Sequence, residues 1–330
     1  MRWGIAGSGK IAGAFADTIA ALDGHEVVAV ASGDPERAAG FAARHGIPRS
    51  HAPHAELAAA GDVDAVYVGT TNDRHLQDAL ACVGAGIPVL CEKPLTLDAA
   101  SGRHLVERAR EAGVFLMEAM WMRFLPGFGR VLDLIGAGRI GTPAWVHADF
   151  GFPARLEAGG RLVEPVLGGG ALLDIGIYPL TLIHAVLGPP DDFSATAVLA
   201  DSGVDLQVGV HARHGEAFSS AEATLVADTP LEAVVAGSEG RIRLHRPFHH
   251  AERLTFERAG EVVETIDLPL GGSGYRFEVL EVARCLAEGL VESPMRPHAD
   301  TLAVLEWMDA IRSDVGVRYP GEGVPGAVGG

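Results

Sequence analysis

A lysine that directly follows a short apolar run occupies a position where chemistry is common. Residues 87–91 are apolar, and the chain continues with Glu92, Lys93 and Pro94. Because proline cannot continue a central strand, Lys93 is predicted at the carboxyl edge of a parallel sheet, where open α/β folds bind their ligands. Partial burial at such an edge suits an amine to proton transfer or to polarising a hydroxyl. A solvated lysine after a strand fits this short motif as well.

A carboxylate and a phenol are paired in the second half of the chain. Asp174 and Tyr178 lie four residues apart in a helical pattern, so they are predicted on one face of a helix. A carboxylate in so apolar a segment needs a partner, and Lys93 would be one. A tyrosine beside an ammonium gives up its proton more readily and could accept the proton of a substrate hydroxyl while a nicotinamide takes the hydride. Without Lys93, a capping aspartate and a core tyrosine explain the pair equally well.

A glycine-rich loop precedes the first predicted helix. The pattern Gly7-x-Gly9-x-x-Ala12 stands between an apolar strand at 2–6 and a helical pattern, which is the context of a dinucleotide-binding loop. There the first glycine makes the tight turn, the second lets a pyrophosphate approach the backbone, and a small third residue lets the helix pack on the strand. A glycine-rich turn of any α/β protein is the alternative.

The end of the second predicted strand bears on the choice of cofactor. NAD-preferring domains commonly have an acidic residue there, whereas this chain has Ser32. Ser32 leaves room for a 2′-phosphate, and Arg37 in the first turn of the next helix could pair with it. Asp34 is the competing residue, either as a ribose-binding acid or as a helix cap. We therefore expect NADP as the preferred cofactor, with NAD possible.

The elements that must position these groups change character near residue 120. Strands alternating with helices indicate right-handed βαβ units in a parallel sheet, with the strands at 2–6, 26–31, 64–68, 87–91 and 114–118. After a helix at 126–137 the pattern becomes largely β, with one apolar helix at 171–187. The β runs lie at 144–152, 193–200, 204–214, 217–226, 231–237, 241–245, 252–257 and 261–268, and two helices follow at 276–289 and 299–313.

The predicted fold is therefore α/β in two domains. Residues 1–121 would form a Rossmann domain with a doubly wound parallel sheet. Residues 122–330 would form a substrate-binding and oligomerisation domain of the α+β type, whose open, largely antiparallel sheet has one face packed and the other exposed or used for association. The tail at 321–330 is expected to be loose.

Charge and cysteine content exclude several classes of partner. The formal net charge of -17 argues against nucleic acid and anionic membranes, because both require a basic surface. The three cysteines, Cys82, Cys91 and Cys285, have no metal-site spacing, so we expect neither a disulfide framework nor a bound metal. Cys91 beside Glu92 reads as buried packing. No uncharged apolar run reaches the length of a spanning helix, and a cytoplasmic location is expected.

Four motifs in this order carry a resemblance to a known family: Gly7-Ser8-Gly9-Lys10-Ile11-Ala12, Thr71-Asn72-Asp73-Arg74-His75, Cys91-Glu92-Lys93-Pro94 and Gly168-Gly169-Gly170-x-x-x-Asp174-x-Gly176-x-Tyr178. The chain resembles the glucose-fructose oxidoreductase / inositol dehydrogenase / MocA family over roughly residues 1–320. That resemblance implies a Rossmann domain followed by a domain whose open sheet often forms a dimer face. It also implies oxidation or reduction of a secondary alcohol or carbonyl on sugars, inositols or related diols.

The tyrosine at 178 narrows the resemblance, because most members of the family have histidine there. Tyr178 is similar to the branch of dimeric dihydrodiol dehydrogenases and NADP-dependent D-xylose 1-dehydrogenases. This implies Lys93 and Tyr178 as the catalytic pair, with Asp174 in support. One position departs from the pattern: NADP-binding relatives often have arginine where this chain has Gly33, which would leave Arg37 and Ser32 to hold the phosphate.

The remaining predicted site residues form a substrate-binding set and a cofactor-binding set. The substrate pocket would be lined by Trp121, Arg123, Phe150 and Tyr275. The cofactor would be bound by Gly7, Ser8, Gly9, Lys10, Ile11, Ser32, Gly33, Arg37, Thr70, Thr71, Asn72, His75, Glu92 and Lys93. His75 would lie near the nicotinamide ribose or the pyrophosphate, and a helix-surface histidine is the alternative.

Three further expectations concern a pair of histidines, the partners of the chain and an alternative function. His249 and His250 are adjacent in a β-like stretch, so their side chains should diverge and not share a metal. The partners expected are a small polyol, sugar or diol and a second copy of the chain, in a homodimer or homotetramer built through the second sheet. The alternative function is a non-catalytic regulator that senses nucleotides on the same scaffold.

Overall fold

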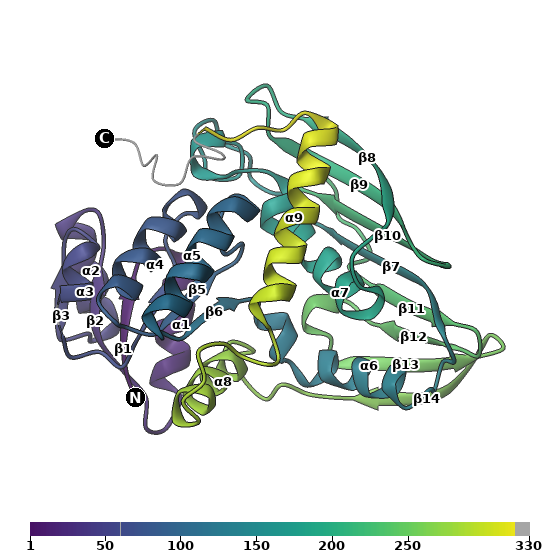
Figure 1. Ribbon diagram of the computed structural model, residues 1–330, viewed down its shortest axis with the longest axis horizontal. Helices are drawn as coiled ribbons and strands as arrows, with labels where there is room; N and C mark the ends of the chain where they lie inside the picture. Colours follow the sequence, from purple (N-terminus) through teal and green to yellow (C-terminus); the bar gives the residue numbers. More distant parts are fainter. Residues whose placement is uncertain (60, 321–330) are drawn as a thin grey trace. The chain divides into compact units, whose positions relative to one another are not determined.

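The computed structural model describes residues 1–59 and 61–320, which form two compact units (Figure 1). The first unit consists of Met1–Trp121 together with Tyr275–Leu302, and the second consists of Met122–Gly274 with the residues from Ala303 on. The predicted boundary after residue 121 coincides with the point where the chain first passes from one unit to the other, between Trp121 and Met122. The return of Tyr275–Leu302 to the first unit was not part of that prediction. The predicted loose tail lies outside the described residues.

The first unit is built on a six-stranded parallel sheet with the order β3-β2-β1-β4-β5-β6. Its strands are β1 (Arg2–Ala6), β2 (Glu26–Ala31), β3 (Arg49–His51), β4 (Ala65–Val68), β5 (Val89–Glu92) and β6 (Leu116–Ala119). The order reverses between β1 and β4, and ligands of doubly wound sheets bind at the carboxyl ends of the strands beside such a reversal. The predicted Rossmann fold is confirmed.

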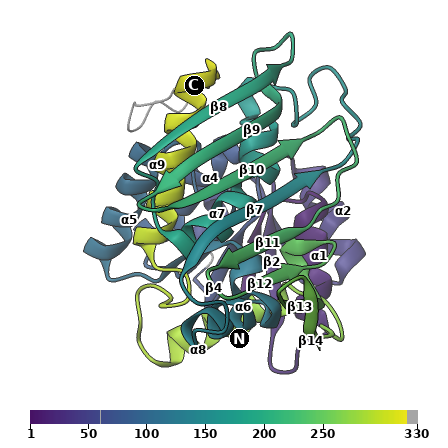
Figure 2. The same ribbon diagram turned by 90° about the vertical axis from the view of Figure 1, so that its right-hand side faces the viewer.

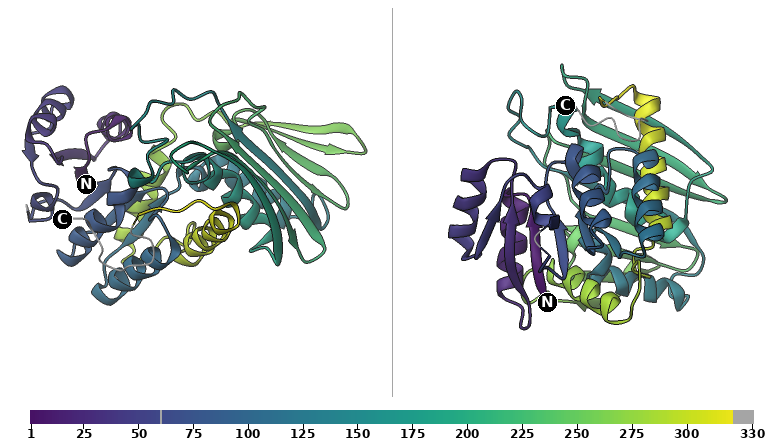
Figure 3. Two further views of the ribbon diagram at one scale, coloured as in Figure 1. Left: turned by 90° about the horizontal axis from the view of Figure 1, so that it is seen from above. Right: turned by 60° about the vertical axis from the view of Figure 1, so that its left-hand side comes forward.

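Helices form two layers on this sheet (Figure 3). One layer holds α1 (Lys10–Ala20) and α2 (Pro35–His45), and the other holds α3 (Ala55–Ala59), α4 (His75–Gly84) and α5 (Ala99–Ala112). Their ends follow the sequence: the side chains of Asp34 and Asp98 cap α2 and α5, and Gly46 and Gly113 end them with φ of 65°. Short η1 (Asn72–Arg74) precedes α4, and α8 (Arg276–Ala287) packs on α1.

The second unit is built on an eight-stranded sheet with the order β14-β13-β12-β11-β7-β10-β9-β8 (Figure 2). Its strands are β7 (Pro143–Gly151), β8 (Asp192–Leu199), β9 (Asp205–His214), β10 (Ala217–Thr224), β11 (Ala233–Gly237), β12 (Arg241–Leu244), β13 (Arg253–Arg258) and β14 (Glu261–Asp267). All neighbouring pairs are antiparallel except β7 and β10, which are parallel. The predicted open, largely antiparallel sheet is confirmed.

Alternating side chains give this sheet two different faces. On β7, Val146, Ala148 and Phe150 are buried, whereas Trp145 is 43% exposed and His147 is partly exposed. The buried face packs against α7 (Ile177–Leu187) at β7 and β10. This period-two burial is the pattern expected of an antiparallel sheet with one covered face.

The remaining helices of the second unit come before, between and after its strands in sequence. They are η2 (Trp121–Phe124), which begins at the boundary, α6 (Pro126–Gly136), η3 (Pro165–Leu167), η4 (Leu172–Gly176), α7, η5 (Phe248–His250) and α9 (His298–Val315), whose first turn belongs to the first unit. The stretch Pro165–Leu187 is long and apolar enough to cross a membrane by length and composition, with a mean hydropathy of 1.7. Its most apolar window is 83% buried in the protein, as in a core helix.

A buried ion pair joins the returning segment to the first sheet. Arg296 donates to Glu118 Oε2 from Nε at 3.0 Å and from Nη2 at 2.6 Å, and both side chains are 1% exposed. Thr301 donates to the same oxygen at 3.1 Å, while the other oxygen of Glu118 accepts from Leu95 N at 3.1 Å. The segment after α8 is therefore fixed to β6 and to the chain that follows Lys93.

Candidate active site

The glycine-rich loop has the conformation that a dinucleotide requires. Gly7 has a φ of 114°, and a Cβ on it would lie 2.5 Å from the carbonyl oxygen of Gly69, so no other residue fits. Nothing lies within 4 Å of a Cβ placed on Gly9. Gly9 is the N-cap of α1, whose first turn has no side-chain cap. The free backbone N–H groups and the open space above Gly9 fit a pyrophosphate.

The turn after β2 keeps a hydroxyl and a guanidinium available. Ser8 and Ser32 lie 3.2 Å apart through their Oγ atoms, and Ser32 Oγ accepts from Asp34 N at 3.4 Å. Asp34 Oδ1 accepts from Arg37 N at 2.8 Å, so this acid is the helix cap and not a free ribose ligand. The Arg37 side chain is exposed and has no acidic partner in the described part of the chain. The turn therefore fits a phosphate on the ribose.

The loop after β4 presents one buried hydroxyl without a partner. Thr70 Oγ1 makes no hydrogen bond within the described residues, whereas Thr71 and Asn72 lead into η1. Such an orphaned oxygen at the switch point of the sheet fits a polar group of a bound cofactor.

His75 is 1% exposed, so the alternative of a helix-surface histidine was wrong. Its Nδ1 lies 2.8 Å from the carbonyl oxygen of Pro94, and its Nε2 lies 3.3 Å from that of Thr70. Burial lowers the pKa of His75, which keeps the ring neutral and leaves it one N–H, directed at the closer carbonyl. His75 therefore links the loop after β4 to the turn that carries Lys93.

Lys93 lies half-buried at the end of β5, on a turn held from several sides. Glu92 Oε1 accepts from the Tyr67 hydroxyl at 2.6 Å, and its Oε2 accepts from Lys93 N at 3.2 Å. Burial raises the pKa of Glu92, and Tyr67 and Lys93 oppose that shift. The backbone on both sides of the lysine is thus fixed, which confirms its predicted place at the carboxyl edge of the sheet.

A second carboxyl group faces Glu92 from the returning helix α8. Glu278 is 0% exposed, and neither of its oxygens has a hydrogen-bond partner among the described residues. Burial, with Glu92 as the second cause, raises the pKa of Glu278 well above its usual value. Glu278 was not among the site residues predicted from the sequence. One signal was available: Glu278 precedes the buried Val282 and Cys285 by four and seven residues, on one helix face.

Two of the four predicted pocket residues meet in the first unit. The rings of Trp121 and Tyr275 have centroids 5.0 Å apart at 48°. Arg123 belongs to the second unit, where its guanidinium lies over the ring of Phe128 at 4.7 Å. Cys91 is fully buried, and burial followed by Glu92 raises the pKa of its thiol, in agreement with the packing role predicted for it.

Asp174 has an arginine partner that the sequence analysis missed. Arg161 contacts it with Nη1–Oδ1 and Nη2–Oδ2 distances of 3.0 and 3.4 Å, both within the second unit. The predicted helical stretch from residue 171 to residue 187 is present, with a π-helical turn at Leu172–Gly176 followed by the α-helix from Ile177. At Gly176 the turn packs closely, because a Cβ there would lie 3.1 Å from Leu172 Cδ1 and 3.4 Å from Ala223 Cβ.

Tyr178 lies in an aromatic cluster of the second unit. Its ring centroid is 5.4 Å from Phe150 and 5.4 Å from His249, and the Phe150 and His249 rings stack at 4.2 Å. His249 lies in η5, not in a strand, so the prediction of diverging strand side chains for His249 and His250 was wrong; their rings are 4.9 Å apart. The place of His249 beside Phe150 and Tyr178 was not predicted from the sequence.

The predicted site residues thus form two clusters, one in each unit. The first holds the dinucleotide loop, the Lys93 turn and the Trp121–Tyr275 pair, and the second holds Asp174, Tyr178 and Phe150. The pairing of Lys93 with Tyr178 stays a prediction. Among the described residues, no three His, Cys, Asp or Glu side chains gather as a metal site.

Comparison with known proteins matches both halves of the chain to family models. Residues 1–120 match the oxidoreductase family with an NAD-binding Rossmann fold, and residues 128–243 match the GFO/IDH/MocA C-terminal domain. The trans-1,2-dihydrobenzene-1,2-diol dehydrogenase of Danio rerio is 37% identical over 97% of this chain and 98% of its own length.

Solved structures show the same architecture. The 3-ketoreductase KijD10 from Actinomadura kijaniata, solved with NADP and TDP-benzene, has a TM-score of 0.85 and 28% identity over 96% of this chain and 98% of its own. The aldose-aldose oxidoreductase from Caulobacter crescentus has a TM-score of 0.86 over 96% of this chain and 97% of its own, and at 22% identity it supports the fold alone.

Proposed function

The chain belongs to the GFO/IDH/MocA family of NAD-binding oxidoreductases, and we propose that it transfers a hydride between NADP and a secondary alcohol or carbonyl of a vicinal diol, sugar or inositol. The observation that carries the proposal is the turn that holds Lys93 at the carboxyl end of β5, on the same edge of the parallel sheet as the uncapped N-terminus of α1. The names of the relatives, dihydrodiol dehydrogenase and 3-ketoreductase, support this class of substrate.

The residues of the chain would handle the proton of the reaction. When bound, the nicotinamide cofactor supplies hydride acceptance or donation. Lys93 would hydrogen-bond the substrate hydroxyl and ease its deprotonation, and Tyr178 would relay the proton. Asp174, held by Arg161, would orient Tyr178 one turn further along the helix.

The polar turn after β2 supports a preference for NADP over NAD. Ser32 presents a hydroxyl where an acidic residue would repel a phosphate, and Asp34 is occupied as a helix cap. The exposed Arg37 supplies a guanidinium suited to a phosphate monoester. The aromatic rings of Trp121 and Tyr275 support a ring-shaped substrate with an apolar face.

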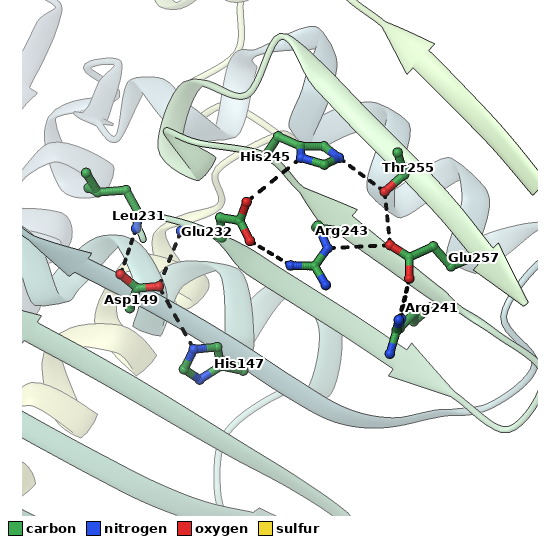
Figure 4. A network of polar contacts seen from close by, with 9 residues as sticks. All are labelled: His147, Asp149, Leu231, Glu232, Arg241, Arg243, His245, Thr255 and Glu257. Atoms are coloured by element: carbon green, nitrogen blue, oxygen red, sulfur yellow. Dashed lines mark hydrogen bonds and ion pairs between the residues drawn. The ribbon is translucent and has the colours of Figure 1, made fainter. Parts of the chain in front are cut away.

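The outer face of the second sheet supports a homodimer. Trp145 and Phe218 are paired across β7 and β10 and are 43% and 59% exposed, which is unusual for two adjacent large rings. Beside them runs a polar network (Figure 4) in which Arg243 joins Glu232 at 2.6 Å and Glu257 at 3.4 Å. An aromatic centre next to satisfied charges is the composition of a protein interface. A cytoplasmic location belongs to the same proposal.

A substrate panel tests the function directly. Reduction of NADP would be followed with pentoses, hexoses, inositols and trans-dihydrodiols, for the wild type and for Lys93→Met. We expect turnover of at least one substrate, its loss in Lys93→Met, and unchanged NADP affinity in that variant. Arg44→Met removes an exposed charge from α2 and is the matched control. Binding of NADP without turnover of any substrate would instead favour the nucleotide-sensing regulator.

A further inference from the structure

Three basic side chains come from separate loops at the carboxyl edge of the first sheet. Arg37 lies in the first turn of α2 after β2, His54 follows β3, and Arg74 ends η1 after β4. Of these three basic residues, only Arg37 contributed to the NADP preference predicted from the sequence. His54 belongs to none of the four motifs, and Arg74 lies in the Thr71–His75 motif without a role assigned to it so far.

A buried carboxylate fixes the positions of His54 and Arg74. Asp78, with a side chain 4% exposed, accepts from Arg74 Nη2 at 2.8 Å and from Arg74 Nε at 3.3 Å. The same carboxylate lies 3.8 Å from His54 Nδ1. One anchor in α4 therefore orients both basic groups, and the His54 side chain itself is only 10% exposed.

The Cε1 atom of the His54 ring, next to Nδ1, faces the turn after β2. A Cβ placed on Gly33 would lie 3.9 Å from His54 Cε1, and no other atom lies within 4 Å of it. Gly33 thus leaves open space on the His54 side of the turn. A side chain at this position would fill the space, whereas glycine leaves it available to a ligand group.

The charged groups that face His54 are two cations and one anion. Burial, opposed by Asp78 but reinforced by Arg74 and Arg37, lowers the pKa of His54. These three are the charged groups that face it: Asp78 from α4, Arg74 from η1 and Arg37 from α2. A phosphate dianion in the open space would offset the two arginines and favour the protonated ring.

We propose that His54 and Arg74 complete, with Ser32 and Arg37, the binding site for the 2′-phosphate of NADP, and that His54 takes up a solvent proton when this phosphate binds. The inference rests on the proposed NADP-dependent function and adds the residues that set cofactor specificity. NAD has a hydroxyl in place of the phosphate and would leave His54 neutral. Selectivity for NADP is therefore linked to proton uptake.

The test compares the binding of NADP and NAD to the wild-type protein and His54→Gln. Calorimetric titration at pH 7 in two buffers of different ionisation enthalpy gives both the dissociation constants and the protons taken up. We expect His54→Gln to weaken NADP about tenfold and NAD less than about twofold, since one charge-assisted hydrogen bond is lost. The wild type should take up more protons with NADP than His54→Gln does, and neither should do so with NAD.

Two further variants separate this site from general effects of charge. Arg37→Gln should also weaken NADP selectively, whereas Arg44→Gln, in the last turn of the same helix, should change neither cofactor. An unchanged ratio of NADP to NAD affinity in His54→Gln, or an equal weakening of both, would overturn the inference while leaving the proposed function intact. If the wild type binds neither cofactor, the proposed function and the inference both fail.

Discussion

The buried carboxyl of Glu278 should make the protein less stable as the pH rises. Glu92 has a hydroxyl, a backbone N–H and the nearby ammonium of Lys93 to stabilise its charge, whereas Glu278 has none of these among the described residues. Of the two facing carboxyls, Glu278 is therefore the one that keeps its proton. Its folded-state pKa lies above the unfolded value, so folding retains a proton that the unfolded chain releases.

The size of the effect follows from linkage. Below the unfolded pKa of about 4.3 both states of the chain hold the proton and the stability of the protonated form is complete. Above it, one retained proton lowers the free energy of unfolding by about 1.4 kcal/mol for each pH unit, up to the folded pKa. The loss continues until the raised folded pKa of Glu278 is reached, and each pH unit of it is a measurable part of a domain stability of about 5–15 kcal/mol.

Urea unfolding at pH 5, 6, 7 and 8 measures this slope. Glu278→Gln keeps the shape of the side chain and cannot ionise, so it should be about as stable as the wild type at pH 5 and more stable at pH 7 and above. Glu107→Gln, an exposed position on α5, is the matched control and should follow the wild type. Parallel pH profiles for the wild type and Glu278→Gln would refute the assignment of the proton to Glu278.

Two other consequences of the structure can be tested, one by urea unfolding and one by sedimentation. Glu118→Leu should lower the free energy of unfolding, measured in urea, by about 3–5 kcal/mol because it leaves Arg296 buried without its anion. The double variant Glu118→Leu/Arg296→Met should recover most of that loss. Additive costs of the two single substitutions would contradict a coupled pair. Phe218→Asp should convert the proposed homodimer to monomers in sedimentation experiments by placing a charge beside Trp145, while Val166→Asp, exposed outside the sheet, should not; a wild type that sediments as a monomer would remove the dimer.

The sequence predicted those elements whose burial follows a simple period. The strands of both sheets other than β3, and the capped start of helix α2, were found because alternation and cap residues are local signals. The strand β3 and the helix α3 were missed, since three and five residues are too short to show a period. The π-helical turn at Leu172–Gly176 was read as α-helix because the two share their composition.

The partners of the functional residues were harder to predict than the residues themselves. Arg161 lies in a segment without regular structure, so nothing in the sequence pairs it with Asp174. His249 was assigned to a strand, but Pro247 precedes it and the chain forms a 3₁₀ turn that stacks the ring on Phe150. Contacts of this kind depend on how separate elements pack, which local sequence patterns do not encode.

The return of the chain after α8 shows why the first 121 residues are not the whole cofactor-binding unit. Glu118 uses one oxygen to hold Leu95 N, two residues beyond Lys93, and the other to bind Arg296 and Thr301. A fragment ending at residue 121 would keep the dinucleotide loop but leave Glu118 buried without its cation, at a cost comparable to the stability of a small domain. The turn that carries Lys93 therefore depends on a segment far along the chain, since Glu118 and Arg296 are 178 positions apart in sequence. The same returning segment carries Glu278, which faces Glu92. The returning chain therefore fixes the Lys93 turn and also places a second carboxyl group beside Glu92, the residue before Lys93.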